Sequence, residues 1–126
     1  MTIRDIKDIL HAEVLTGEEL LDTEVEAAFG ADLMSDVLAF VTQKTVLITG
    51  LINLHVIRTS EMLDIRCIVF SRGKRPAEDM LEEAEDAGIA VLSTTMTTYT
   101  CCGELYMRGL PGTQERAKTT SEEARG

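Results

Sequence analysis

The chain is poor in the side chains that usually form catalytic and metal centres. Its 126 residues include two histidines, three cysteines and 4% aromatic residues. His11 and His55 stand in no metal-ligand spacing, and the adjacent Cys101 and Cys102 do not form a Cys-x-x-Cys motif. An iron–sulfur or zinc site is therefore not expected, and neither is any other metal or cofactor.

The sequence motifs of common enzyme classes are also missing. The glycine-rich phosphate-binding motifs of nucleotide enzymes do not occur, and neither does the Gly-x-Ser-x-Gly motif of the α/β-hydrolases. Because no nucleophile, base or metal cluster can be assembled, we expect the protein not to be an enzyme. A small enzyme, for example a phosphotransferase remnant, is kept as a third alternative.

Basic charge and long apolar runs are scarce as well. Twelve Lys and Arg residues stand against 22 Asp and Glu residues, a net charge of −10, so we expect no nucleic-acid partner and no binding to an anionic membrane. The longest nearly apolar stretch, residues 46–57, is too short to cross a bilayer, and residues 1–6 lack the pattern of a signal peptide. A cytoplasmic location is expected, with which the odd number of cysteines is compatible.

What the chain does contain is three short apolar runs at regular intervals. They cover residues 46–48, 67–70 and 89–92, recur roughly every 22 residues, and each ends in small or polar residues before a segment that can form a helix. Such runs are typical of strands that are buried on both faces of a parallel sheet. We predict an α/β fold: a single domain over residues 1–110 with a mainly parallel β-sheet flanked by helices.

The remaining elements follow from apolar periodicity and from helix-end signals. Helices are predicted over residues 3–11, 33–40, 54–63, 77–87 and 98–108. Thr2 and Asp32 are the expected N-caps of the first two, and Gly88 closes the fourth. Residues 12–17 predict a short strand, and residues 25–29 alternate weakly like a strand. Residues 111–126 have almost no apolar side chains, so a disordered tail is expected there.

Polar residues follow each of the three central strands. In an open parallel sheet these strand ends share one edge, which is where ligands usually bind. Their hydroxyls, cations and glycines are the parts of an anion or phosphate site. The candidate ligand residues are Ser71, Arg72, Gly73, Lys74, Arg75, Ser93, Thr94, Thr97 and Thr98. The alternative is that the cations pair with acids such as Glu78 or Asp79, while the hydroxyls serve turns and helix caps.

Four segments carry a resemblance to a known family. They are residues 13–17, residues 32–39, the span from Val46 through Gly50 to Pro76, and residues 88–98 with the closing helix. In order and spacing they resemble the DRTGG domain family over roughly residues 2–110. The resemblance implies an α/β module similar to the N-terminal domain of HPr kinase/phosphorylase, one that is regulatory, often dimeric and without established catalytic activity.

The family context also suggests partners. Such domains occur beside CBS domain pairs in regulated pyrophosphatases and in phosphotransacetylases. Stand-alone members are similar to proteins encoded near hydrogenase and redox-complex genes. The resemblance therefore implies an enzyme or a redox complex as a partner.

The chain departs from the motif that gives the family its name. After the first strand glycine, where many members have Asp-Arg-Thr, it has Leu51, Ile52 and Asn53. After the second strand, Ser71, Arg72 and Gly73 replace Thr-Gly-Gly. Apolar Leu51 and Ile52 at a strand end would need to be covered, and a subunit contact would cover them. We therefore predict that this loop belongs to a homodimer interface.

Two functional hypotheses result. The first is a non-catalytic regulatory or interaction module that forms a homodimer. The alternative is a sensor that binds a phosphorylated metabolite or nucleotide at the carboxyl ends of the strands.

Overall fold

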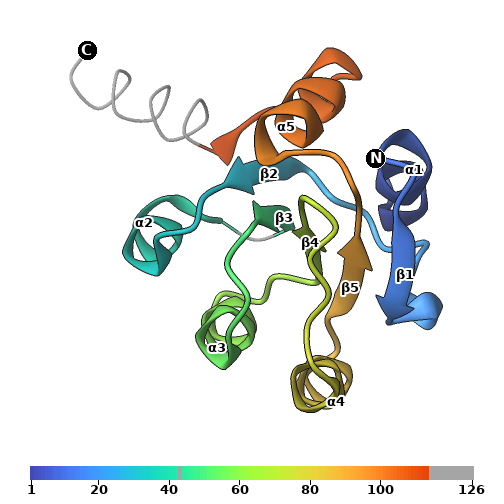
Figure 1. The fold of residues 1–126 in the computed structure, drawn as a ribbon. Coiled ribbons are helices and arrows are strands. Elements are labelled where there is room, and N and C mark those ends of the chain that lie inside the picture. Colours follow the sequence, from blue (N-terminus) through green and yellow to red (C-terminus); the bar gives the residue numbers. More distant parts are fainter. Residues whose placement is uncertain (43, 114–126) are drawn as a thin grey trace.

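A five-stranded sheet lies between two layers of helices in the computed structural model, which describes residues 1–42 and 44–113 (Figure 1). The strands are β1 (Glu13–Thr16), β2 (Ala27–Gly30), β3 (Thr45–Thr49), β4 (Cys67–Phe70) and β5 (Ala90–Ser93). The helices are α1 (Ile3–Ile9), α2 (Met34–Phe40), α3 (Leu54–Met62), α4 (Glu78–Ala87) and α5 (Thr98–Met107), with a 3-10 turn at Glu18–Leu20. The predicted α/β fold with a mainly parallel sheet is confirmed.

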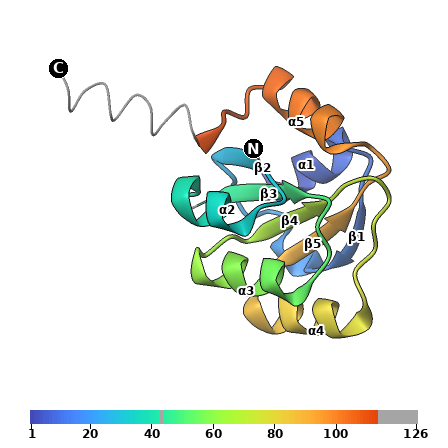
Figure 2. The ribbon, with the colours of Figure 1, turned by 60° about the vertical axis from the view of Figure 1, so that its left-hand side comes forward.

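The order of the strands explains how the helices are distributed. The sheet runs β1-β5-β4-β3-β2, with β2 to β5 parallel and β1 antiparallel to β5. Helices α2, α3 and α4 connect the parallel strands on one face, while α1 and α5 cover the other face (Figures 1 and 2). The weakly alternating residues 25–29 overlap with β2, which becomes the outer parallel strand.

Each central strand contributes to two separate cores. Side chains that point toward α1 and α5 form one cluster, which includes Val46, Ile48, Cys67, Val69, Ala90 and Leu92 with Ile6 and Leu105. Side chains that point the other way form a second cluster with α2, α3 and α4, which includes Leu47, Ile68, Phe70 and Val91. This alternation is what strands buried on both faces require. The three apolar runs were therefore predicted correctly.

The helix ends agree with the sequence except at one position. Thr2 and Asp5 form a full capping box at α1, as expected from Thr2. Asn53 caps α3, and Gly88 ends α4 in the left-handed conformation. Asp32, however, does not cap α2. The N-cap is Leu33 without a side-chain hydrogen bond, because the Asp32 carboxylate is bonded to the neighbouring strand instead.

The segment after α5 packs against the sheet, in contrast to the expectation of a tail from residue 111. The Ala28 amide donates to the Pro111 carbonyl at 2.9 Å, and Gly112 forms a bridge with Ala28. Leu110 and Thr113 are buried. Residues 114–126, the remainder of the predicted tail, lie outside the described residues.

Gly17, in the turn after β1, lies close to the backbone of β5, and a substitution there tests this contact. Gly17 has φ +88°, and a Cβ there would lie 2.6 Å from the Ala90 Cα. We expect Gly17→Ala to lower the free energy of unfolding by about 2–4 kcal/mol, from backbone strain and overpacking together. Urea unfolding measures the difference.

Gly88→Ala is the matched control for this substitution. Gly88 also has positive φ, +73°, but a Cβ there meets nothing within 4 Å. Its cost is expected to be about 1–2 kcal/mol, from strain alone. Equal losses in the two variants would contradict the close approach of the Gly17 turn to β5.

Candidate functional site

The carboxyl edge of the sheet is where the chain changes from one face to the other. After β4 it continues to α4 on one face, and after β5 it continues to α5 on the opposite face. In open sheets such a divergence leaves a crevice for a ligand. Here the Arg72 amide donates to the Met96 carbonyl and the Gly73 amide donates to the Thr94 carbonyl, both at 2.7 Å. The backbone therefore bridges the two diverging loops.

Three of the hydroxyls at this edge are hydrogen-bonded within the chain. The Oγ of Ser71 lies 2.7 Å from the Oγ1 of Thr98, which links the end of β4 to the start of α5. Ser93 donates to the Lys74 carbonyl, and Thr94 donates to the carbonyl of Leu10, each at 2.8 Å. Ser71, Ser93 and Thr94 are also buried. Their hydroxyls thus hold loops and helices together through contacts between distant parts of the chain.

Of the three cations predicted for the site, Arg75 is in an ion pair, whereas no ion pair is found for Arg72 and Lys74 within the described residues. Arg75 forms a two-pronged ion pair with Glu13 of β1, at 3.2 and 2.9 Å. This contact lowers the pKa of Glu13 and raises the pKa of Arg75 by hydrogen bonding first and charge second. Glu13, rather than the expected Glu78 or Asp79, is therefore the partner. Both side chains are exposed, so the pair contributes little to stability.

Arg72 holds the central position at the edge. Its backbone is left-handed, with φ +60°, an uncommon conformation for a residue other than glycine. The side chain reaches back over the end of β3, where its Nη2 would lie 2.6 Å from a Cβ at Gly50. Glycine at position 50 thus makes room for the guanidinium. Arg72 makes no side-chain hydrogen bond or ion pair within residues 1–42 and 44–113.

Asp32 is a member of this site that the sequence interpretation missed. Its Oδ1 accepts hydrogen bonds from the Gly50 amide and from the Thr49 hydroxyl, both at 2.9 Å. The Gly50 amide first, and then the Thr49 hydroxyl, lower the pKa of Asp32; partial burial opposes them, and the charge of Arg72 adds to the lowering. Ends of three neighbouring strands, β2, β3 and β4, therefore meet through Asp32, Gly50 and Arg72.

The other predicted site residues lie around this centre. Leu51 and Ile52 are half-buried and pack against the core cluster of α2, α3 and α4. Their place in a dimer interface stays a prediction. Thr97 donates to Thr100 at 3.2 Å, and the first turn of α5 has no side-chain cap. Gly73 and Lys74 are exposed in the loop after β4.

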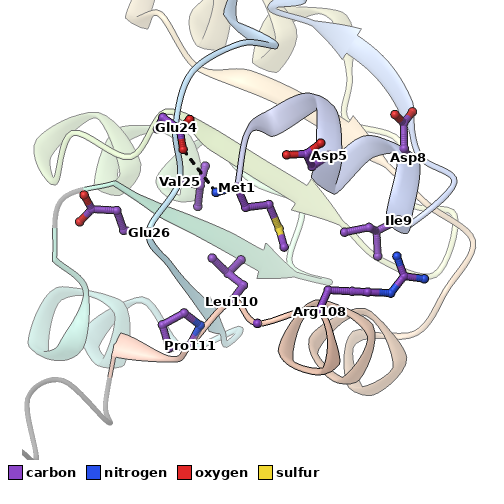
Figure 3. A pocket seen from close by; sticks show the side chains of 11 residues that line it. Met1, Asp5, Asp8, Ile9, Glu24, Val25, Glu26, Arg108, Leu110 and Pro111 are labelled. Carbon is purple, nitrogen blue, oxygen red and sulfur yellow. Dashed lines mark hydrogen bonds and ion pairs between the residues drawn. The ribbon is translucent and has the colours of Figure 1, made fainter.

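A separate pocket lies away from this edge, between α1, the segment before β2 and the segment after α5 (Figure 3). It has a volume of about 700 Å³, with Met1, Val25 and Leu110 among its apolar side chains. The acids around it are Asp5, Asp8, Glu24 and Glu26; the cations are Arg108 and the N-terminal amine of Met1, which pairs with Glu24 at 3.3 Å. None of the predicted ligand residues lines it, and its charge has the wrong sign for a phosphate.

Reactive groups are sparse in the part of the chain that the structure describes. No group of three or more His, Cys, Asp or Glu side chains is placed to hold a metal ion there. Burial raises the pKa of Cys67 to about 12 and that of Cys101 to about 11, and it also raises the pKa of Cys102. The thiols are therefore protonated and poorly nucleophilic at neutral pH.

Comparisons with known proteins agree with this architecture. The model of the DRTGG domain family matches residues 5–106. A matching solved structure contains the CBS and DRTGG domains of the regulatory region of Clostridium perfringens pyrophosphatase, complexed with its activator diadenosine tetraphosphate. The TM-score is 0.67 at 19% sequence identity, over 99% of this chain and 61% of that one, so the present chain spans less than two thirds of its neighbour. No curated protein sequence matched.

The pKa of Asp32 makes a pH-dependent prediction. The folded state lowers this pKa, so the carboxylate stabilises the fold at pH values above its ordinary pKa of 3.8. This stabilisation is lost as the pH falls through the lowered pKa of the folded state. Asp32→Asn keeps an acceptor oxygen but removes the charge. We expect it to cost about 1 kcal/mol at pH 7, a figure reduced for solvent screening.

Urea unfolding of both proteins at pH 7 and near pH 3 provides the measurement. The difference in unfolding free energy between wild type and Asp32→Asn should shrink at the lower pH. Protonation of the wild-type carboxyl begins to remove the charge that the variant lacks. A difference that is the same at both values would show that the charge of Asp32 does not contribute.

Proposed function

The chain belongs to the DRTGG domain family, and from this premise we propose that it is a non-catalytic regulatory or interaction module that functions as a homodimer. The single observation that carries the proposal is the use of side chains at the carboxyl edge. An α/β enzyme usually places its reactive groups there. In this chain the buried hydroxyls of Ser71, Ser93 and Thr94 are bonded to Thr98, Lys74 and Leu10.

Two further observations support a role without turnover. The cysteine thiols have raised pKa values, which keeps them protonated. The neighbouring solved structure is part of the regulatory region of an enzyme rather than its catalytic part. An enzyme or redox complex as partner, and a cytoplasmic location, stay predictions. Within the described residues no helix is long and apolar enough to cross a membrane.

A second candidate function is a sensor for a phosphorylated metabolite or nucleotide. Arg72 favours it, because its guanidinium makes no side-chain hydrogen bond within the described residues and stands, in an uncommon backbone conformation, at the edge of the sheet where ligands usually bind. Lys74 is exposed in the same loop, and α5 begins nearby without a side-chain cap. In the neighbouring protein the activator is diadenosine tetraphosphate. Nucleoside polyphosphates are therefore the first ligands to test.

Thermal unfolding in the presence of nucleotides, diadenosine tetraphosphate or sugar phosphates separates the two candidates. A ligand at a hundred times its Kd adds about 2.7 kcal/mol, which corresponds to a shift of several degrees for a domain of this size. For the sensor we expect such a shift in the wild type and its loss in Arg72→Ala.

The matched control is Arg58→Ala, which removes the same charge from the α3–α4 side, where Arg58 pairs with Glu83. This variant should keep the ligand-induced shift. A panel without any shift would contradict the sensor and favour the protein-interaction role.

The homodimer is tested by the mass of the wild-type protein in solution. Sedimentation velocity over a range of concentrations should show a dimer, and a protein that stays monomeric throughout would contradict this part of the proposal. Leu51→Asp and Ile52→Asp test the predicted loop contact. Both side chains already pack on the core of their own chain, so the unfolding free energy of each variant must be measured alongside its mass.

A further inference from the structure

Helix α5 has a second apolar face that points away from the protein. Cys101 and Leu105 are fully buried against the sheet, whereas Tyr99, Tyr106 and Met107 are 88%, 59% and 78% exposed. At 100° per residue these three exposed side chains form one stripe, opposite the buried one. In Figure 2 the helix lies on the outside of the fold with no element above it. Large apolar side chains gathered in this way mark an interaction surface.

A hollow lies in the middle of this stripe. Gly103 stands between Tyr99 and Tyr106, and a Cβ built on it meets nothing within 4 Å. The space above Gly103, lined by these tyrosines and by Met107, measures about 530 Å³. A glycine in the interior of a helix is destabilising relative to alanine. No contact within the described residues requires a glycine here.

We propose that α5 is the face through which two copies of this chain pair. The two α5 helices cross so that large side chains of each copy enter the hollow over Gly103 of the other. This inference rests on the proposed function, because it names the surface of the homodimer. The contact through the Leu51–Ile52 loop is the alternative that the experiment below distinguishes from it.

The stripe is complementary to itself. A twofold axis brings the same patch of both subunits together, so knobs and hollows must occur on one surface. Tyr99, Tyr106 and Met107 are the knobs, and Gly103 provides the hollow. Both features belong to the same helix, so an axis that passes near Gly103 satisfies both copies at once.

The scarcity of charge on the stripe allows a second copy to approach. Each chain carries a net charge of −10, so two copies repel each other over most of their surface. Of the residues that line the hollow, Glu104 is the charged one. Helix α4, in contrast, exposes the acids Glu78, Asp79, Glu82, Glu85 and Asp86. The α5 stripe is thus a face where two equal chains can approach with little repulsion.

The exposed area is sufficient for a dimer of modest affinity. At about 200 Å² for a side chain of this size, Tyr99, Tyr106 and Met107 together expose about 450 Å² in each copy. Burying these side chains and their neighbours in both copies removes roughly 1,200 Å² from water, the lower end of specific interfaces. A Kd in the micromolar range, about 1–100 μM, is expected.

The decisive variant is Gly103→Gln. In the free monomer the new side chain meets open space, and glutamine favours the helix more than glycine does. In the dimer it fills the hollow that the partner requires. We therefore expect a melting temperature at high dilution equal to or above that of wild type, together with a dimer Kd that is at least tenfold higher. If Gly103 had only a structural role, the substitution would leave the Kd unchanged.

Sedimentation velocity and concentration-dependent melting of the full chain provide the measurements. Tyr99→Ser removes a knob instead of filling the hollow, and it should weaken the dimer as well. Met62→Gln is the matched control: Met62 is 75% exposed at the end of α3, so its replacement should leave the Kd unchanged.

The outcomes separate this inference from the proposed function. A wild-type protein that is monomeric throughout overturns the homodimer and the α5 interface together. A dimer that withstands both Gly103→Gln and Tyr99→Ser overturns the α5 interface alone, and its loss in Leu51→Asp would assign the contact to the loop after β3.

Discussion

The burial of β3, β4 and β5 on both faces is the constraint on which the rest of this structure depends. Alternate side chains of these strands enter two different cores, so helices are needed on both sides of the sheet. Each aliphatic side chain left in water would forfeit roughly 1.5–3 kcal/mol. Because α2, α3 and α4 occupy one face, the chain must change faces after β5 to place α5 on the other.

That change of faces shapes the chemistry of the carboxyl edge. Loops that diverge expose polar backbone and hydroxyl groups, and buried groups of this kind need hydrogen-bond partners. The partners here come from the chain itself: Thr98 for Ser71, the Lys74 carbonyl for Ser93 and the Leu10 carbonyl for Thr94. Arg72 and Lys74, in contrast, are exposed at this edge.

Local signals were sufficient for most of the elements but not for the contacts of the edge. The runs at residues 67–70 and 89–92 correspond to β4 and β5 within a residue, because a short apolar run closed by turn residues is a local pattern. Asp32 before a helix is equally local, and it predicted an N-cap. The Thr49 and Gly50 groups that bind it instead lie 17 and 18 residues away. Glu13 and Arg75 are separated by 62 residues.

The sequence by itself determined the strands, the helices and their order, since hydrophobic periodicity and end signals act within a few residues. It also pointed to the carboxyl edge of the sheet, where Ser71 and Arg72 lie. Only the tertiary structure decided which groups there are used internally, because hydrogen bonds between strand ends depend on which strands become neighbours. The outward stripe of α5 was decided in the same way: packing on the sheet buries Leu105 and leaves Tyr99, Tyr106 and Met107 uncovered.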